Sequence, residues 1–185
     1  MKRSAVLAAV LLAAMPAIAQ PMSEATVRVG GQAMFPSKTI VANAVNSKDH
    51  TTLVSAVKAA GLVDTLNSRG PFTVFAPTNA AFGMLPAGTV ESLVKPENKE
   101  TLTKVLTYHV VPGNYDTNRI RAMILAGNGT AELKTVSGGR LWLTMNGSTN
   151  ILIKDEKGEV GDITISDVRQ SNGVIHVVDH VLMPG

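Results

Sequence analysis

The fold of this chain is decided by two apolar stretches, FTVFAPTNAAF at residues 72–82 and NGVIHVVDHVLMP at residues 172–184. The first is typical of a buried strand that ends at Pro77, where a backbone donor is missing, and leads into a helix capped by Thr78 or Asn79. The second opens with an Asn-Gly turn and continues as an almost unbroken apolar strand, which indicates burial on both faces. Two segments this far apart must meet to be buried, so they predict one compact domain.

The rest of the chain divides into a helical first part and a strand-rich last third. Apolar residues recur at helical spacing over residues 39–45 and 51–66. Strands separated by glycine turns are predicted over residues 130–136, 140–145, 150–153, 163–168 and 174–182. Because the strands follow the helices and do not alternate with them, we expect an α+β fold built on an antiparallel meander.

The N-terminus follows the pattern of a secretory signal peptide. Lys2 and Arg3 precede a short apolar run, and Ala-Ile-Ala at residues 17–19 forms a small-residue cleavage site. The run is too short to span a bilayer, so we expect an exported chain with no transmembrane segment after cleavage. The expected organisation is a signal peptide over residues 1–19, a flexible arm over residues 20–36 and a folded domain over residues 37–185.

The composition argues against several classes of function. Lys and Arg number 17 against 14 Asp and Glu, and two of the basic residues lie in the predicted signal peptide. The mature chain is then close to neutral, so nucleic-acid binding, which needs a clustered basic face, is not expected. The absence of cysteine removes thiol catalysis and thiolate metal sites.

Histidine is the residue type that would indicate a metal site or an enzyme. His176 and His180 flank Asp179 at a spacing that suits a metal only on a helix. In a strand the two histidines stand about 13 Å apart, too far for one ion. We therefore expect no metal and no cofactor, and interpret His176 as a buried, neutral, hydrogen-bonded residue. No Gly-x-Ser-x-Gly motif occurs, no catalytic residue is assigned, and the chain is predicted not to be an enzyme.

Together the two stretches resemble the signature segments of the fasciclin-like domain family. Tyr108-His109-Val110, which lies between them, is similar to that family's tyrosine–histidine motif. The resemblance covers about residues 36–185 and implies a β-sandwich or wedge of mainly antiparallel strands, packed against several helices from the N-terminal half. It also implies a secreted, single-domain member of the bacterial type.

The resemblance marks individual positions as candidates for function. Tyr108 and His109 belong to a motif linked to integrin recognition in eukaryotic relatives, and Asp167 remains from an adhesive signature that this chain otherwise lacks. These three are the candidate binding residues, with a packing role as the alternative for Tyr108 and His109. For Asp167 the alternative is to organise the turn at Asn172. The structural motif positions are Phe75, Pro77, Thr78, Asn79, Phe82, Asn172, Gly173, His176 and Asp179.

The function implied by the resemblance is non-enzymatic interaction or adhesion, in the periplasm or outside the cell. The expected partners are cell-surface or matrix proteins or glycans. A second function stays open, a periplasmic carrier of a small apolar ligand, since 45% of the residues are hydrophobic and eight are methionine. Trp142 is interpreted as a core residue, with an exposed binding anchor as the alternative. An exposed apolar patch would favour adhesion, and a closed cavity would favour a carrier.

Overall fold

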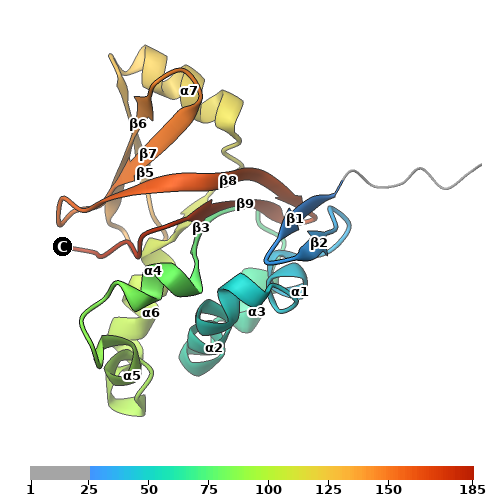
Figure 1. Ribbon diagram of the computed structural model, residues 1–185, viewed down its shortest axis with the longest axis vertical. Helices are drawn as coiled ribbons and strands as arrows, with labels where there is room; N and C mark the ends of the chain where they lie inside the picture. The colour runs from blue at the N-terminus through green and yellow to red at the C-terminus, as the bar shows by residue number, and fades with distance from the viewer. Residues whose placement is uncertain (1–25) are drawn as a thin grey trace, which may run out of the picture.

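The computed structural model describes residues 26–185, so the predicted signal peptide and the first residues of the predicted arm lie outside the described residues. Within the described part, no helix is both long and apolar enough to cross a membrane. This part consists of a large mixed sheet with helices packed against it (Figure 1), and the expected α+β class is confirmed.

The large sheet brings the two signature stretches side by side. Its strands are β3 (Phe72–Pro77), β4 (Val110–Pro112), β5 (Thr130–Lys134), β6 (Arg140–Asn146), β7 (Asn150–Lys154), β8 (Val160–Gln170) and β9 (Gly173–Val178). The spatial order is β4-β3-β9-β8-β7-β6-β5, and every neighbouring pair is antiparallel except β3 and β9. The meander from β5 to β9 is confirmed. The contact between β3 and β9 was expected, but its parallel direction was not, because the predicted fold was built on antiparallel strands.

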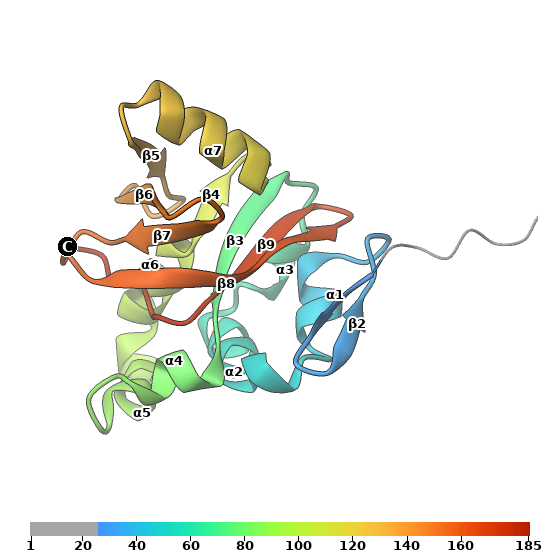
Figure 2. The same ribbon diagram turned by 45° about the horizontal axis from the view of Figure 1, so that its top comes forward.

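The sheet curls until its edge strands approach each other. Val136, which follows β5, donates its N–H to the Val110 carbonyl of β4 at 2.8 Å. The long strand β8 shifts register twice against β9, and such bulges bend a strand. Figures 1 and 2 show β8 running through both halves of the sheet. Because one continuous sheet forms both halves, a sandwich of two separate sheets is not confirmed.

The helices lie mostly before the meander, as predicted. They are α1 (Ile40–Ala44), α2 (Thr51–Ala60), α3 (Val63–Asn67), α4 (Asn79–Gly83), α5 (Thr89–Leu93), α6 (Lys99–Tyr108) and α7 (Thr117–Ala126), with 3-10 turns at Lys48–His50 and Pro96–Asn98. The helical pattern over residues 51–66 is divided between α2 and α3. Gly61 adopts a left-handed φ of 73° and ends α2 there.

A flexible arm was predicted over residues 20–36, and this prediction is wrong for residues 26–36, which the structure describes. Strands β1 (Val27–Val29) and β2 (Gln32–Met34) form an antiparallel hairpin. Gly30 and Gly31 both have positive φ, the conformation that a two-residue hairpin turn requires. Val29 and Met34 are buried against the domain, so this segment gains apolar burial that a loose arm would lack.

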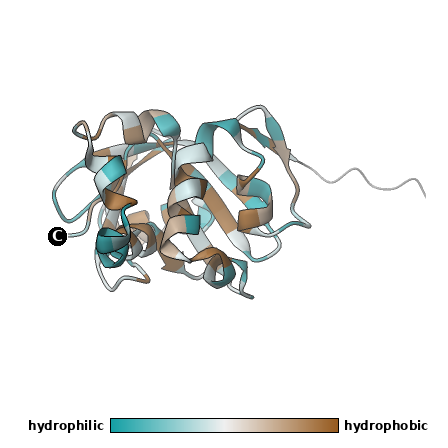
Figure 3. Ribbon diagram, turned by 90° about the horizontal axis from the view of Figure 1, so that it is seen from below, coloured by the Kyte–Doolittle hydropathy of each residue, from teal (hydrophilic) through white to brown (hydrophobic). Residues whose placement is uncertain are grey.

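Two hydrophobic cores lie on opposite faces of β3 and β9. The inner core is enclosed by the curled sheet and closed by α7. It includes Phe75, Tyr108, Leu141, Leu143, Ile153 and Val178. The helix-side core lies between the sheet and helices α1, α2, α4 and α6. It includes Leu53, Val57, Val74, Leu106 and Ile175. Figure 3 shows the apolar strands behind the helices. The two signature strands are therefore buried on both faces, as predicted.

Candidate functional site

The strand of the first signature stretch contributes to both cores. Phe75 is fully buried in the inner core, and its ring stacks on the imidazole of His176 with 5.7 Å between centroids. Val74 and Ala76, on the other face, belong to the helix-side core. Pro77 is buried and is the last residue of β3.

The residues that follow this strand connect helix α4 to other helices of the domain. Thr78 caps α4, because its side chain accepts a hydrogen bond from the Ala81 N–H at 3.2 Å. Asn79 has a different role, since its side-chain oxygen accepts from the Thr52 N–H at 3.0 Å, at the start of α2. Phe82 is buried in the helix-side core. These positions fix the helices against each other, and their side chains are engaged within the domain.

Asn172 holds three segments together from the turn before β9. Its side-chain oxygen accepts from the Ile40 N–H at 3.0 Å. Its side-chain nitrogen donates to the carbonyls of Leu66, at 2.8 Å, and Ser68, at 3.0 Å. Because Asn172 is buried, a loss of these bonds would leave unpaired polar groups in the interior.

Gly173 and Asp179 define the two ends of β9. A Cβ on Gly173 would lie 2.0 Å from the carbonyl oxygen of Phe72, so only glycine allows the two signature strands to pair here. Asp179 accepts a hydrogen bond from the Asp162 N–H at 2.7 Å, and the chain bends after Val178. The strand predicted to reach residue 182 is therefore too long.

Tyr108, a candidate binding residue, is fully buried at the end of α6. Its hydroxyl donates to the Arg140 carbonyl at 2.6 Å and accepts from the Glu156 N–H at 3.0 Å. Burial raises the pKa of Tyr108 well above its ordinary value. The phenol therefore joins α6 to the meander and has no free surface for a partner.

His109, the second candidate, is also buried. Its Nδ1 donates to the Val105 carbonyl at 2.8 Å, and its Nε2 accepts from the Leu182 N–H at 3.0 Å. The bond that Nε2 accepts requires a neutral ring with its proton on Nδ1. Burial lowers the pKa of His109 to about 4, so the ring stays neutral near pH 7. The residue fixes the C-terminal segment against α6.

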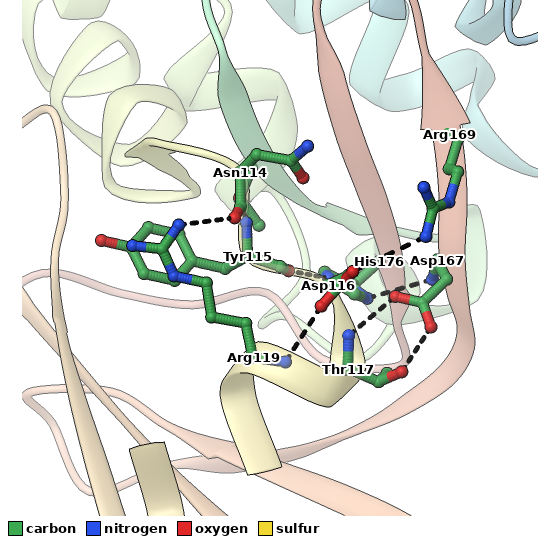
Figure 4. Close-up of polar contacts among 9 residues, drawn as sticks. Asn114, Tyr115, Asp116, Thr117, Arg119, Asp167, Arg169 and His176 are labelled. Atoms are coloured by element: carbon green, nitrogen blue, oxygen red, sulfur yellow. Dashed lines mark hydrogen bonds and ion pairs between the residues drawn. The ribbon is translucent and has the colours of Figure 1, made fainter. Parts of the chain in front are cut away.

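Asp167, the third candidate, lies at a bend in β8 with a left-handed φ of 57°. This conformation is unfavourable for most residues other than glycine, and aspartate tolerates it when its side chain is hydrogen-bonded locally. The carboxylate accepts from the Thr117 N–H at 2.8 Å and also from the Thr117 hydroxyl (Figure 4). Asp167 thus organises the start of α7, and the expected role at the Asn172 turn is wrong.

His176, in β9, lies next to Asp167 of the neighbouring strand β8. Its Nδ1 accepts from the Asp167 N–H at 3.4 Å, and its Nε2 donates to the Tyr115 carbonyl at 2.8 Å. Burial lowers the pKa of His176. A neutral imidazole with both nitrogens paired has no electron pair left to bind a metal or take a proton.

The outer rim of this cluster carries exposed charged side chains. Asp116 caps α7 by accepting from the Arg119 N–H at 2.9 Å, and it forms an ion pair with Arg169 at 3.6 Å. The Arg119 guanidinium lies over the Tyr115 ring, 4.5 Å from its centroid. Figure 4 shows these groups turned toward one another between α7 and β8. In the rim, each charged side chain is therefore engaged by a neighbour, Asp116 by Arg169 and Arg119 by Tyr115.

The histidines and acids of the described residues do not assemble a metal site. Among residues 26–185, no three His, Cys, Asp or Glu side chains are grouped so that they could hold an ion. His180, which the sequence pairs with His176, instead lies 3.6 Å from the Glu159 carboxylate.

An apolar cavity that the sequence did not reveal lies between α2 and the sheet. Its volume is about 200 Å³, and almost all of its wall is apolar. Val54 and Val57 of α2, Val74 of β3 and Ile175 of β9 form part of the wall. The helical pattern predicted which side of α2 faces inward. It did not reveal the space, because a cavity depends on how side chains from separate elements meet.

Trp142 was interpreted from the sequence as a core residue, with an exposed position as the alternative, and the core interpretation is wrong. Leu141 and Leu143 are fully buried in the inner core. Trp142 lies between them in β6, so the pleat turns it to the opposite face, where it is half-buried. Its indole N–H donates to the Glu132 carboxylate at 3.2 Å. The alternation of Leu141, Trp142 and Leu143 along the strand is visible in the sequence, and it indicates that Trp142 points away from the core.

Comparisons with known proteins agree with this geometry. The fasciclin domain family model matches residues 48–184. Protein sll1483 of Synechocystis is 44% identical over 175 residues, covering 92% of this chain and 88% of that protein. The cell surface glycolipoprotein MPB83 of Mycobacterium bovis is 36% identical over 161 residues, covering 84% of this chain and 64% of that protein.

A solved structure supports the same fold. A FAS1 domain pair of the insect cell adhesion molecule fasciclin I superimposes with a TM-score of 0.57 at 22% identity, over 71% of this chain and 45% of that chain. With the family match spanning most of the described residues, and with both signature strands paired at the centre of the sheet, the chain belongs to the fasciclin domain family.

Proposed function

We propose that this chain is a non-enzymatic interaction module that binds proteins or glycans at the cell surface or outside the cell. The site is the Trp142 face, which we define as the outward side chains Glu132, Trp142, Leu152, Lys154 and Val160. The observation that carries the proposal is the position of Trp142 on this accessible face, while Tyr108 and His109 are buried.

The Trp142 face has the composition of a small binding surface. Glu132, Trp142, Lys154 and Val160 are consecutive cross-strand neighbours from β5 to β8. Along this row, charged side chains of opposite sign alternate with apolar ones. Val160, at its end, is 49% exposed. Tryptophan is enriched among residues that dominate binding energy, and a polar rim around it gives specificity.

The location outside the cytoplasm is part of the same proposal. The N-terminal pattern of basic residues, apolar run and cleavage site supports export. The relative MPB83 is named a cell surface glycolipoprotein. Export with a periplasmic or extracellular destination would place the Trp142 face where envelope macromolecules are available.

Replacing the indole tests this function. Trp142→Ala should weaken binding to solubilised cell-envelope fractions roughly 30-fold, the effect of losing one dominant anchor. Leu125→Ala is the matched control, because Leu125 is 79% exposed on α7 and lies outside the Trp142 face. Binding can be measured by surface plasmon resonance on immobilised protein. Equal binding by wild type and Trp142→Ala would reject this face as the site.

A second function, a carrier of a small apolar ligand, is supported by the cavity beneath α2. An apolar space of about 200 Å³ exceeds the ordinary voids of a protein interior. Native mass spectrometry of protein purified from its own host should then detect a bound mass that is lost on denaturation. Recovery of the bare chain mass alone would count against this second function.

A further inference from the structure

Three asparagines of this chain, Asn128, Asn146 and Asn172, are followed directly by glycine. In such a pair the backbone nitrogen of the glycine can attack the side-chain amide carbon of the asparagine and close a five-membered ring, and no Cβ obstructs the approach. The rate of an intramolecular reaction depends on how freely the two reacting groups can meet. The three pairs share this chemistry, but their surroundings in the folded domain differ.

The pair at Asn172 is the most protected. Asn172 is buried, and its amide is held by the Ile40 N–H and by the carbonyls of Leu66 and Ser68. Gly173 is the first residue of β9 and pairs with the neighbouring strand β3. Ring closure would require the amide to leave all three partners, so this pair should react only when the domain opens.

The pair at Asn128 is protected in part. Asn128 is exposed just after α7 and has a left-handed φ of 54°. The N–H of Gly129, however, donates to the Ile124 carbonyl at 2.8 Å, a bond that closes the end of the helix. Because the attacking nitrogen is held by this bond, the bond must break before the ring can close.

The pair at Asn146 is free. Asn146 is exposed at the end of β6, and Gly147 begins the loop that leads to β7. Among the described residues, no hydrogen bond involves the side-chain amide of Asn146 or the N–H of Gly147. A Cβ built on Gly147 would meet no atom within 4 Å, so the loop has open space around it. Both reacting groups can therefore move toward each other while the domain stays folded.

We propose that Asn146 is a site of spontaneous deamidation in the folded protein. The Gly147 nitrogen forms a bond to the amide carbon of Asn146, the bond from that carbon to the amide nitrogen breaks, and ammonia leaves with the proton of the Gly147 N–H. Water then opens the cyclic imide at either carbonyl and gives aspartate or isoaspartate. Both products add a negative charge. Isoaspartate also lengthens the main chain by one carbon where Asn146 pairs with Asn150, so it alters the end of this hairpin.

The relative rates of the three pairs test the proposal. The full chain is incubated at mildly alkaline pH, and peptide mapping by mass spectrometry follows the conversion of each asparagine. We expect Asn146 to convert roughly two- to tenfold faster than Asn128, the factor that corresponds to breaking one hydrogen bond. Asn172 should remain unmodified over the period in which Asn146 converts.

The same chain unfolded in guanidinium chloride is the matched control, because there the three pairs should convert at similar rates. Asn146→Gln, which would have to close a larger ring, should remove the fastest conversion and leave that of Asn128 unchanged. Conversion of Asn128 or Asn172 in the folded chain at the rate of Asn146 or faster would overturn the proposal. A ranking in the unfolded chain equal to that in the folded chain would also overturn it, since the fold would then have no part in the selection.

Discussion

The inner core is enclosed by one curled sheet, whereas the helix-side core is shared between separate helices and the back of that sheet. In the inner core, Leu141, Leu143 and Ile153 are completely buried and belong to one apolar cluster. On the helix side, α2 buries small residues such as Ala56 and Ala60, and a cavity remains. Hydrogen-bonded strands have a fixed spacing that side chains must fill, but helices pack only through side chains and can leave space between them.

The largest expected effect compares one leucine from each core. Leu143→Ala in the inner core should lower the free energy of unfolding by about 4 kcal/mol, near the upper end for such a change. Leu53→Ala beside the cavity should cost about 2.5 kcal/mol, because the removed side chain already borders empty space and has fewer contacts to lose. Urea unfolding of both variants measures the difference. An equal or larger loss for Leu53→Ala would contradict the contrast between the cores.

The next effect concerns His109, which touches both regions: it lines the cavity and holds Leu182 of the inner core. Its pKa is about 4 in the folded protein, against 6.5 for an unperturbed histidine, so the unfolded chain binds more protons between these values. Stability should therefore be fully present above pH 6.5 and decrease as the pH falls to about 4, by about 3 kcal/mol.

Thermal or urea unfolding across this pH range measures the loss. Burial also lowers the pKa of His50 and of His176, so both rings contribute in the same direction, and His109→Gln serves to isolate the share of His109. That variant cannot titrate at this position and should show a smaller decrease between about pH 7 and pH 4. A pH dependence identical to that of the wild type would show that His109 does not gain a proton on unfolding.

The smallest effect tests whether space is available. Val57→Ile adds one methylene beside the cavity and should raise the free energy of unfolding by about 0.8 kcal/mol. Val178→Ile makes the same change in the inner core, where the residue is fully buried, and should lower it by about 1 kcal/mol through overpacking. Differential scanning calorimetry resolves opposite signs. A shift of the same sign in both variants would mean that the two cores are equally filled.

Much of the fold could be predicted because its signals are local. The cap at Thr78, the turn at Gly173 and the alternation through β5 to β7 each depend on neighbours in the chain. The hairpin at Gly30 was missed although its two-glycine signal was present. The candidate site was less predictable. The sequence identified Asp167 as distinctive, but its partner Thr117 is fifty residues away.

The sequence by itself determined the family, the helical and strand-rich parts of the chain, and the burial of both signature strands, because spacing and residue type act over a few residues. Only the tertiary structure decided that β3 pairs parallel with β9, that Tyr108 and His109 are enclosed, and that an apolar cavity remains beneath α2. These outcomes depend on the distance between side chains from separate elements, and packing sets that distance.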